Sequence, residues 1–306
     1  MIKQRILITG ALGQLGVSLI RVLSKRSDTY ILATDINAPK EEIDVDFECV
    51  NALDTNRLEE LIVQHKIDCI YHLAAILSAK GEKNPFQSWH VNVNSFQVTV
   101  ELAIKHKVQR VFWPSSIAVY GEDKNPINAP QQVDMNPLTM YGVSKLACEK
   151  LMIYYHQKFN LDIRSLRLPG VLSSDPAGGG TTDYAVEMVQ AVKNGKDYTC
   201  FLAPQTELPM IYIDDVVIAI EQFMESNLSN QERAHSYNIM GFSLTPAMLE
   251  SQLHKMGYPA EVHYAPDYRQ QIAESWPRTI QDQFARDHWG WAPQFDLEKS
   301  IKQMIP

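Results

Sequence analysis

The sequence predicts an α/β fold, in which a doubly wound parallel sheet is followed by a smaller C-terminal lobe. The first half of the 306-residue chain alternates short β-branched runs with longer stretches of helical periodicity, which is typical of βαβ units. After Pro169 a glycine-rich loop at 178–180 and frequent prolines replace this alternation. We therefore expect a first domain over residues 1–168 and a mainly substrate-binding lobe over residues 169–306.

The expected strands of the first domain are short apolar runs bounded by turn residues, and they cover residues 6–8, 30–34, 47–50, 69–73, 110–113 and 163–168. Between them, longer segments with apolar residues at helical spacing predict helices over 14–24, 56–65, 92–106 and 140–159. Right-handed crossovers would place these helices on both faces of the sheet. Residues 211–215, followed by an apolar helix over 216–223, predict that a segment at about 208–225 returns to the first domain, with Asp214 or Asp215 capping its helix.

Composition excludes several classes of function. The formal net charge is −8 and no basic stripe is present, which argues against binding to nucleic acid or to an anionic membrane. No apolar run of about 18 residues suggests a membrane span. Cys49, Cys69, Cys148 and Cys200 lack metal-site spacing, so we expect reduced thiols and no metal. The first strand starts close to Met1, so we expect no targeting peptide and a cytoplasmic location.

A glycine motif predicts a dinucleotide site. Gly10, Gly13 and Gly16 lie between the first predicted strand and the first predicted helix, where glycines allow a pyrophosphate to approach the helix N-terminus. The fold is therefore Rossmann-like. Asp35 ends the second predicted strand about twenty residues later, where a carboxylate can accept hydrogen bonds from an adenosine ribose. Because it would repel a 2′-phosphate and no arginine stands beside it, the predicted cofactor is NAD and not NADP.

Tyr141 and Lys145 lie four residues apart, and therefore on one face of a predicted helix. A free phenol, with a pKa near ~10, is a poor base at neutral pH, and a nearby ammonium favours the phenolate. Ser116 follows an apolar run at 110–113 and adds a hydroxyl. These three residues predict a catalytic set in which Tyr141 takes a hydroxyl proton, Lys145 assists it and Ser116 binds the substrate oxygen.

Together these segments resemble the extended short-chain dehydrogenase/reductase superfamily. The resemblance places the adenine near Asn51 and Ala52, the pyrophosphate and nicotinamide ribose along residues 72–75, and the nicotinamide in front of Asn92. We interpret His72 as a packed residue without a catalytic role. The implied cofactor contacts are Gly10, Gly13, Gln14, Leu15, Gly16, Asp35, Ile36, Asn51, Ala52, Leu73, Ala74, Ala75, Asn92, Tyr141, Lys145 and Leu168.

Four further segments, at 75–79, 178–185, 198–202 and 206–210, resemble the short-chain type of L-threonine 3-dehydrogenase. The resemblance implies oxidation of the 3-hydroxyl of L-threonine to 2-amino-3-oxobutanoate. The substrate contacts that we infer with it are Ser78, Ser116, Tyr141, Thr181, Thr182, Asp183 and Trp276.

Two of these substrate contacts have a second interpretation. Asp183 can bind an ammonium group or cap a helix over 184–192, and Trp276 can act as a lid or as a core residue.

Other functions stay open at this point. A nucleotide-sugar 4-epimerase or dehydratase uses the same catalytic trio, but it needs basic residues for a diphosphate, and residues 173–187 contain none. A non-catalytic dinucleotide-binding regulator is a second alternative, although retention of the whole trio argues against it. The superfamily resemblance also implies a homodimer through helices such as those expected at 92–106 and 140–159.

Overall fold

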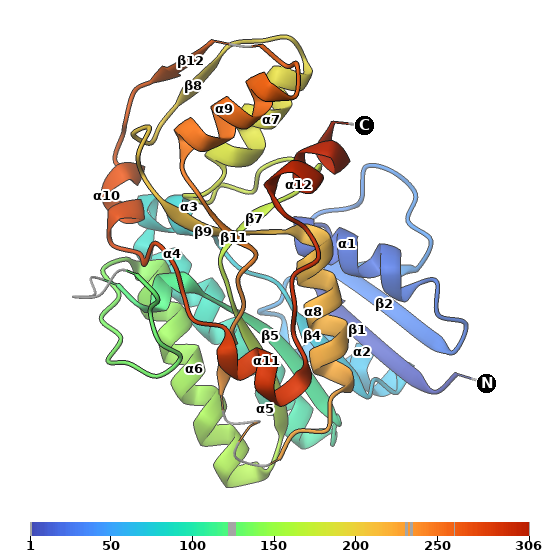
Figure 1. Cartoon of the computed structure of the whole chain (residues 1–306). Helices are drawn as coiled ribbons and strands as arrows, with labels where there is room; N and C mark the ends of the chain where they lie inside the picture. The colour runs from blue at the N-terminus through green and yellow to red at the C-terminus, as the bar shows by residue number, and fades with distance from the viewer. Residues whose placement is uncertain (1, 122–126, 230–231, 233–234, 260, 306) are drawn as a thin grey trace.

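The computed structural model describes residues 2–121, 127–229, 232, 235–259 and 261–305. Within these residues the largest element is a seven-stranded sheet in the order β10-β6-β5-β4-β1-β2-β3 (Figure 1). All neighbouring strands in it are parallel, which confirms the predicted fold class. The strands are β1 (Gln4–Thr9), β2 (Thr29–Asp35), β3 (Asp46–Cys49), β4 (Cys69–His72), β5 (Arg110–Ser116), β6 (Asp162–Leu168) and β10 (Ser236–Asn238).

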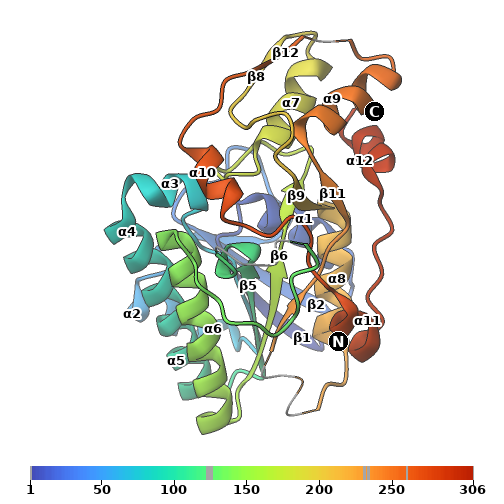
Figure 2. The ribbon, with the colours of Figure 1, turned by 60° about the vertical axis from the view of Figure 1, so that its left-hand side comes forward.

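Helices cover both faces of this sheet, because a parallel sheet is apolar on both sides. One face packs against α1 (Gln14–Leu23) and α8 (Ile213–Glu225) through a core that includes Leu19 and Phe223. The opposite face packs against α2 (Thr55–His65), α5 (Ser95–Lys105) and α6 (Met140–Phe159) through Phe96 and Met152 (Figure 2). The strands therefore hold α1 and α6 on opposite sides of one rigid layer.

The second lobe lies above the carboxyl ends of the main strands (Figures 1 and 2). Its small sheets pair β7 (Gly170–Leu172) and β11 (Phe242–Leu244) with β9 (Leu208–Tyr212), and β8 (Tyr198–Cys200) with β12 (Val262–Tyr264). A shared core cluster joins Tyr141 of the first domain to Tyr184, Phe201 and Trp276 of the lobe. The remaining helices are α3 (Ser78–Lys83), α4 (Pro85–Trp89), α7 (Tyr184–Lys193), α9 (Pro246–Lys255), α10 (Arg269–Glu274), α11 (Gln283–Trp289) and α12 (Leu297–Met304).

The segment at 208–225 departs partly from expectation. Helix α8 packs against α1 and β6 of the first domain, as expected, but β9 joins the small sheet beside β7 and β11 instead of the main sheet. Neither Asp214 nor Asp215 caps α8, whose N-cap is Tyr212. The Asp215 carboxylate instead accepts hydrogen bonds from the backbone N–H groups of Gln294 and Phe295. The division of the chain at residue 168 stays a prediction.

Three elements of the first domain had no clear signal in the sequence. Helices α3 and α4 are only six and five residues long, and β10 has three residues, too few to show a periodic pattern. The helix expected at 92–106 begins instead as a π-helix at His90–Asn94 before α5. Among the described residues, no helix is long and apolar enough to cross a membrane, and no cluster of potential metal ligands is present.

Candidate active site

The site lies where the strand order of the main sheet reverses, between β1 and β4. In open α/β sheets, ligands bind outside the carboxyl ends of the strands at such a point. Gly10 leaves β1 with a φ of +69°, and a Cβ at this position would lie 2.6 Å from the backbone nitrogen of Ala74. The loops after β1 and β4 thus meet so closely that a side chain on Gly10 would clash with the backbone. This geometry fits a glycine turn that binds a dinucleotide.

Helix α1 is held equally close to the turn before it. A Cβ on Gly16 would lie 2.4 Å from the carbonyl oxygen of Ala11, whereas one on Gly13 would meet the carbonyl oxygen of Gly10 at 3.4 Å, an ordinary contact. Gly13 is the N-cap of α1, and no described side chain caps this helix end. The first N–H groups of α1 therefore suit a pyrophosphate. Gln14 lies at this end, and its amide donates to the carbonyl oxygens of Asp175 and Pro176 in the second lobe.

Asp35 is fixed at the end of β2. One carboxylate oxygen accepts from the backbone N–H of Leu12 at 3.1 Å, and the other accepts from Asn37. Ile36 follows with 67% of its surface exposed. Asn51 lies beyond β3, where its side-chain oxygen accepts from the N–H of Leu53, and Ala52 follows it. The predicted ribose and adenine contacts therefore all follow the neighbouring strands β2 and β3.

Asn92 holds the loop that follows β4. Its side-chain oxygen accepts from the N–H of Ile76 at 2.8 Å, its amide donates to the carbonyl oxygen of Ile76 at 3.0 Å, and it also reaches Ser144 on α6. The buried Asn92 lies in the π-helix before α5, an irregularity that often marks functional positions. Asn92 therefore ties the expected cofactor segment Leu73, Ala74 and Ala75 to α6.

His72 has the structural role expected from the sequence. Its buried ring nitrogens lie 2.8 Å from the Thr9 hydroxyl and 3.0 Å from the Ser95 hydroxyl, with Thr99 at 3.2 Å. Burial, together with the charge of Lys145, lowers the pKa of His72 to about 3. The ring is therefore neutral at physiological pH.

Tyr141 and Ser116 meet because the start of α6 packs tightly on the end of β5. Thr139 caps α6 by accepting from the N–H of Gly142, and a Cβ on Gly142 would lie 2.3 Å from the carbonyl oxygen of Ala118. This close approach brings Tyr141, in the first turn of α6, near Ser116, whose hydroxyl acts to lower the pKa of Tyr141. Leu168 ends the neighbouring strand β6 and is half-buried.

Lys145 by itself does not bring the phenol into working range, contrary to the expectation from the sequence. Burial raises the pKa of Tyr141 to about 12, and only the hydrogen bond with Ser116 opposes this shift. The Lys145 ammonium donates to the carbonyl oxygen of Pro114 at 2.6 Å and lies 5.6 Å from the centre of the Tyr141 ring. Burial also lowers the pKa of Lys145 to about 8. Desolvation thus disfavours both charged forms.

The predicted substrate residues of the two domains meet at Ser78. The Ser78 and Thr181 hydroxyls lie 3.0 Å apart, and the N–H of Thr181 donates to the Ser78 hydroxyl at 3.0 Å. Thr182 follows, half-buried, and its methyl group lies against Gly170. The structure therefore brings Ser78, Thr181 and Thr182 together across the boundary between the domains.

Asp183 has a role that neither interpretation of the sequence anticipated. Although it precedes α7, its side chain makes no capping bond to the described part of that helix. One carboxylate oxygen instead accepts from the N–H groups of Gly179 and Gly180, both at 2.7 Å. Burial raises the pKa of Asp183, against the effect of these two bonds and of the positive charges of Lys80 and Arg269. Asp183 therefore fixes the glycine loop while keeping a charge near the site.

Trp276 is a core residue in this structure. Only 6% of its surface is exposed, and it belongs to the core cluster that contains Tyr141 and Tyr184. This burial favours the core interpretation, and the role of Trp276 as a lid stays a prediction.

Sequence reasoning missed a group of residues around the glycine loop. The N–H of Lys80 donates to the carbonyl oxygen of Gly179, and the Tyr268 hydroxyl donates to the carbonyl oxygen of Ala79. Lys80 and Arg269 also bring positive charge to a loop that has no basic residue of its own. No spacing in the sequence signals these contacts, because they join segments up to 189 residues apart.

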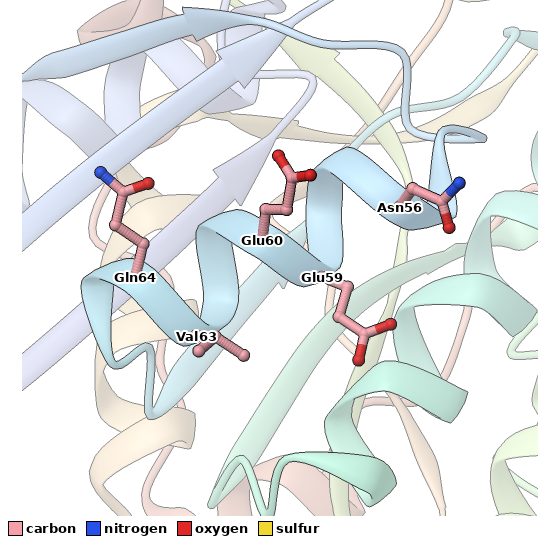
Figure 3. A pocket seen from close by; sticks show the side chains of 5 residues that line it. All are labelled: Asn56, Glu59, Glu60, Val63 and Gln64. Atoms are coloured by element: carbon pink, nitrogen blue, oxygen red, sulfur yellow. The ribbon is translucent and has the colours of Figure 1, made fainter.

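Two depressions on the described surface lie away from this site. The larger measures about 680 Å³ and is lined by Asn56, Glu59, Glu60, Val63 and Gln64, all on the outer face of α2 (Figure 3). It contains none of the predicted site residues. The smaller lies between α5 and α6 and is lined by Glu101, Ile104, Lys105, Tyr154, Tyr155 and Phe159.

The family model described as "NAD dependent epimerase/dehydratase family" matches residues 6–239. The chain belongs to this family. It is 38% identical over 310 residues to an uncharacterized epimerase/dehydratase from Staphylococcus saprophyticus, covering 99% of this chain and 96% of the relative.

Among solved structures, the chain is similar to the holo form of an L-threonine dehydrogenase from Cupriavidus necator, with a TM-score of 0.94, 39% identity and 98% of each chain covered. An L-threonine dehydrogenase from Phytophthora infestans gives a TM-score of 0.93 at 38% identity over 99% of this chain and 98% of that one. The resemblance drawn from the sequence and the predicted cofactor, NAD, are thus confirmed.

The close approach of Gly16 to Ala11 predicts a stability defect. Replacing Gly16 with Ala must move backbone atoms, and such overpacking costs about 1–3 kcal/mol. We expect Gly16→Ala to lower the Tm of the ligand-free protein by several degrees in differential scanning calorimetry. Gly13→Ala is the matched control, because its Cβ makes an ordinary contact. Equal Tm values for the two variants would contradict this role of Gly16.

The glycine loop predicts two separable effects at Asp183. Asp183→Asn keeps an oxygen that can accept from Gly179 and Gly180 but removes the charge, so we expect the Tm to change little and the KM for L-threonine to rise about ten- to a hundredfold. Asp183→Ala should lower the Tm as well, because both loop N–H groups lose their acceptor. Steady-state kinetics and thermal unfolding measure the two effects. A normal KM for Asp183→Asn would refute a role in binding the ammonium group.

Proposed function

We propose that this protein is an NAD-dependent L-threonine 3-dehydrogenase, which oxidises the 3-hydroxyl of L-threonine to 2-amino-3-oxobutanoate. The observation that carries the proposal is the position of α3 between two sets of polar groups. At one end, Ser78 of α3 pairs with Thr181 of the second lobe. Further along, a Cβ on Gly81 would lie 4.0 Å from the Cβ of Tyr141. Helix α3 therefore links the Ser78–Thr181 pair to the start of α6, which carries the proposed base Tyr141.

The same residues fit the chemistry of a β-hydroxy amino acid. The hydroxyls of Ser78, Thr181 and Thr182 can donate to its carboxylate, and the negative charge of Asp183 can attract its ammonium group. Glycines at 178–180 keep the loop free of side chains that would obstruct so small a ligand. These three hydroxyls and one carboxylate therefore suit the carboxylate and ammonium groups of an amino acid.

In the proposed mechanism, Tyr141 takes the proton of the substrate hydroxyl while the C3–H bond breaks. Ser116, whose hydroxyl already acts to lower the pKa of Tyr141, donates to the substrate oxygen as it becomes a carbonyl. Lys145 supplies positive charge near the Tyr141 ring and favours the phenolate. NAD, when bound, supplies the acceptor for the hydride. Gly10, Gly13, Gln14, Leu15, Gly16, Asp35 and Lys145 are the residues that would hold it.

The alternatives receive less support. A UDP-glucose 4-epimerase from Thermotoga maritima has a TM-score of 0.87 but only 22% identity, a similarity that shows the fold alone. The Lys80 and Arg269 charges weaken the sequence argument against a diphosphate, but Arg269 is already paired with Asp267 at 2.7 Å and stacked on Phe201. NADH formation with L-threonine, compared with L-allo-threonine, L-serine and D-threonine, tests the dehydrogenase, and conversion of UDP-glucose to its 4-epimer, which forms no net NADH, tests the epimerase.

We also propose a cytoplasmic location and a homodimer. The four cysteines are free, which suits a reducing compartment. The outer face of α6 exposes aromatic side chains beside the depression between α5 and α6, namely Tyr154 at 48% and Phe159 at 45%. A second copy could bury this surface. The proposal is open to test, because a similar L-threonine 3-dehydrogenase from a metagenome, 40% identical over 98% of this chain and 97% of that one with a TM-score of 0.92, is described as monomeric.

Tyr141→Phe should abolish oxidation of L-threonine while NAD still binds, because the change removes the base and keeps the ring. General-base catalysis contributes about 10²–10⁴-fold, so kcat should fall by at least a hundredfold. NADH absorbance and calorimetric NAD binding measure the two properties. Tyr155→Phe, on the same helix and bonded to Glu101, is the matched control and should keep its activity. Turnover of Tyr141→Phe within tenfold of the unaltered protein would exclude the assignment.

The homodimer predicts that charge on the α6 surface separates the subunits. Tyr154→Glu with Phe159→Glu should convert a dimer to a monomer in size-exclusion chromatography with light scattering, without lowering the Tm of a correctly folded subunit by more than a few degrees. Val63→Glu, on the exposed face of α2, is the control and should stay dimeric. A monomeric unaltered protein would contradict the proposal.

A further inference from the structure

The Lys145 ammonium contacts side-chain and backbone groups that have no role in the proposed reaction as described above. Lys145 is 3% exposed, so its charge has lost nearly all contact with water. Its ammonium lies 4.6 Å from the centre of the Trp113 indole ring and donates to the carbonyl oxygen of Pro114, the next residue on β5. The Lys145 ammonium therefore lies against an aromatic face on one side and donates a hydrogen bond to a backbone carbonyl.

Glu149 adds a negative charge one helical turn beyond Lys145. Its buried carboxylate accepts from the Ser115 hydroxyl at 2.6 Å and from two guanidinium nitrogens of Arg167, both at 2.9 Å. These bonds fix the carboxylate between β5, β6 and α6. Burial lowers the pKa of Lys145, whereas Cys148 and the charge of Glu149 act to raise it.

The other titratable groups near Lys145 are neutral at physiological pH. On α6, burial raises the pKa of Tyr141 and of Cys148 to about 12. On β4, burial lowers the pKa of His72 to about 3. Arg167 of β6 faces Glu149. The Trp113 ring, the Pro114 carbonyl and the Glu149 carboxylate are therefore the groups that favour the charged lysine.

We propose that Trp113 and Glu149 are positioning residues for the reaction, which hold Lys145 as a directed cation between β5 and α6 before substrate and NAD bind. The proposal rests on the proposed function for the catalytic role of Lys145, but its structural basis does not depend on the identity of the substrate. Tryptophan offers the strongest aromatic surface for a cation, and a desolvated contact contributes about 2 kcal/mol or more. Without these groups, Lys145 would lose its proton at a lower pH.

The direct test follows the protonation of Lys145 in the ligand-free protein. Carbon-13 labelling of the lysine Cε atoms and an NMR titration give the midpoint for Lys145, whose signal is assigned by its absence in Lys145→Ala. We expect the midpoint to fall by about one pH unit in Trp113→Leu and in Glu149→Gln, because 1.36 kcal/mol corresponds to one unit. Trp113→Phe, which keeps an aromatic face, should restore most of the unaltered midpoint.

Two further variants separate this effect from a general loss of packing. Phe96 is buried and packs 5.0 Å from Trp113 between ring centres, so Phe96→Leu disturbs the same layer without removing the indole from Lys145. It should leave the midpoint unchanged even if the Tm falls. Glu149→Gln leaves Arg167 without its carboxylate, and the double variant Glu149→Gln/Arg167→Gln removes both charges. If the single variant does not fold, the double variant should still show a fall in the midpoint, although a smaller one, because loss of the Arg167 cation partly offsets loss of the Glu149 charge.

Kinetics give a second readout. In Trp113→Leu and Glu149→Gln, the pH at which kcat/KM for NAD declines on the alkaline side should move down with the NMR midpoint. Unchanged midpoints in folded variants, or an equal fall in Phe96→Leu, would overturn the proposal. Failure of the unaltered protein to oxidise L-threonine would instead overturn the proposed function and leave the titration result standing.

Discussion

Burial of Tyr141 and Lys145 on one face of α6 is the constraint on which the rest of the site depends. Desolvation disfavours the charged form of each group: it raises the pKa of the phenol to about 12 and lowers the pKa of the ammonium to about 8. Their use in catalysis therefore depends on neighbours that restore charge. Ser116 acts on Tyr141, and Trp113, Pro114 and Glu149 surround Lys145. The same low polarity strengthens each electrostatic contact inside the site.

Close backbone contacts position these side chains. Gly10 lets the turn after β1 meet the loop after β4, Gly16 lets α1 approach Ala11, and Gly142 lets α6 approach Ala118. At each position a Cβ would lie within 2.3–2.6 Å of backbone atoms. Since backbone cannot yield as a flexible side chain can, these contacts define both the cofactor cradle and the position of the base. The second lobe then reaches this frame through Ser78, Lys80 and Ala79 of α3.

The main sheet and its helices followed from the sequence because their signals are local. Apolar runs predicted β1 to β6, and the spacing of Tyr141 and Lys145 predicted that both lie on one helix face. The glycine spacing predicted the dinucleotide turn for the same reason. The short elements α3, α4 and β10 were not predictable in this way, because so few residues show no periodic pattern. The position of β9 was not predictable either, because its pairing with β7 and β11 depends on chain segments far apart.

Sequence alone thus determined the fold class and the cofactor and predicted the catalytic trio, since these depend on spacing and residue type. The tertiary structure decided what each side chain does. It turned Asp183 toward the N–H groups of Gly179 and Gly180, buried Trp276 in the core and placed the Lys145 ammonium on Trp113 and Pro114. The physical reason is that desolvation and hydrogen-bond partners arise from residues distant in the chain, and no local pattern records which of them will meet.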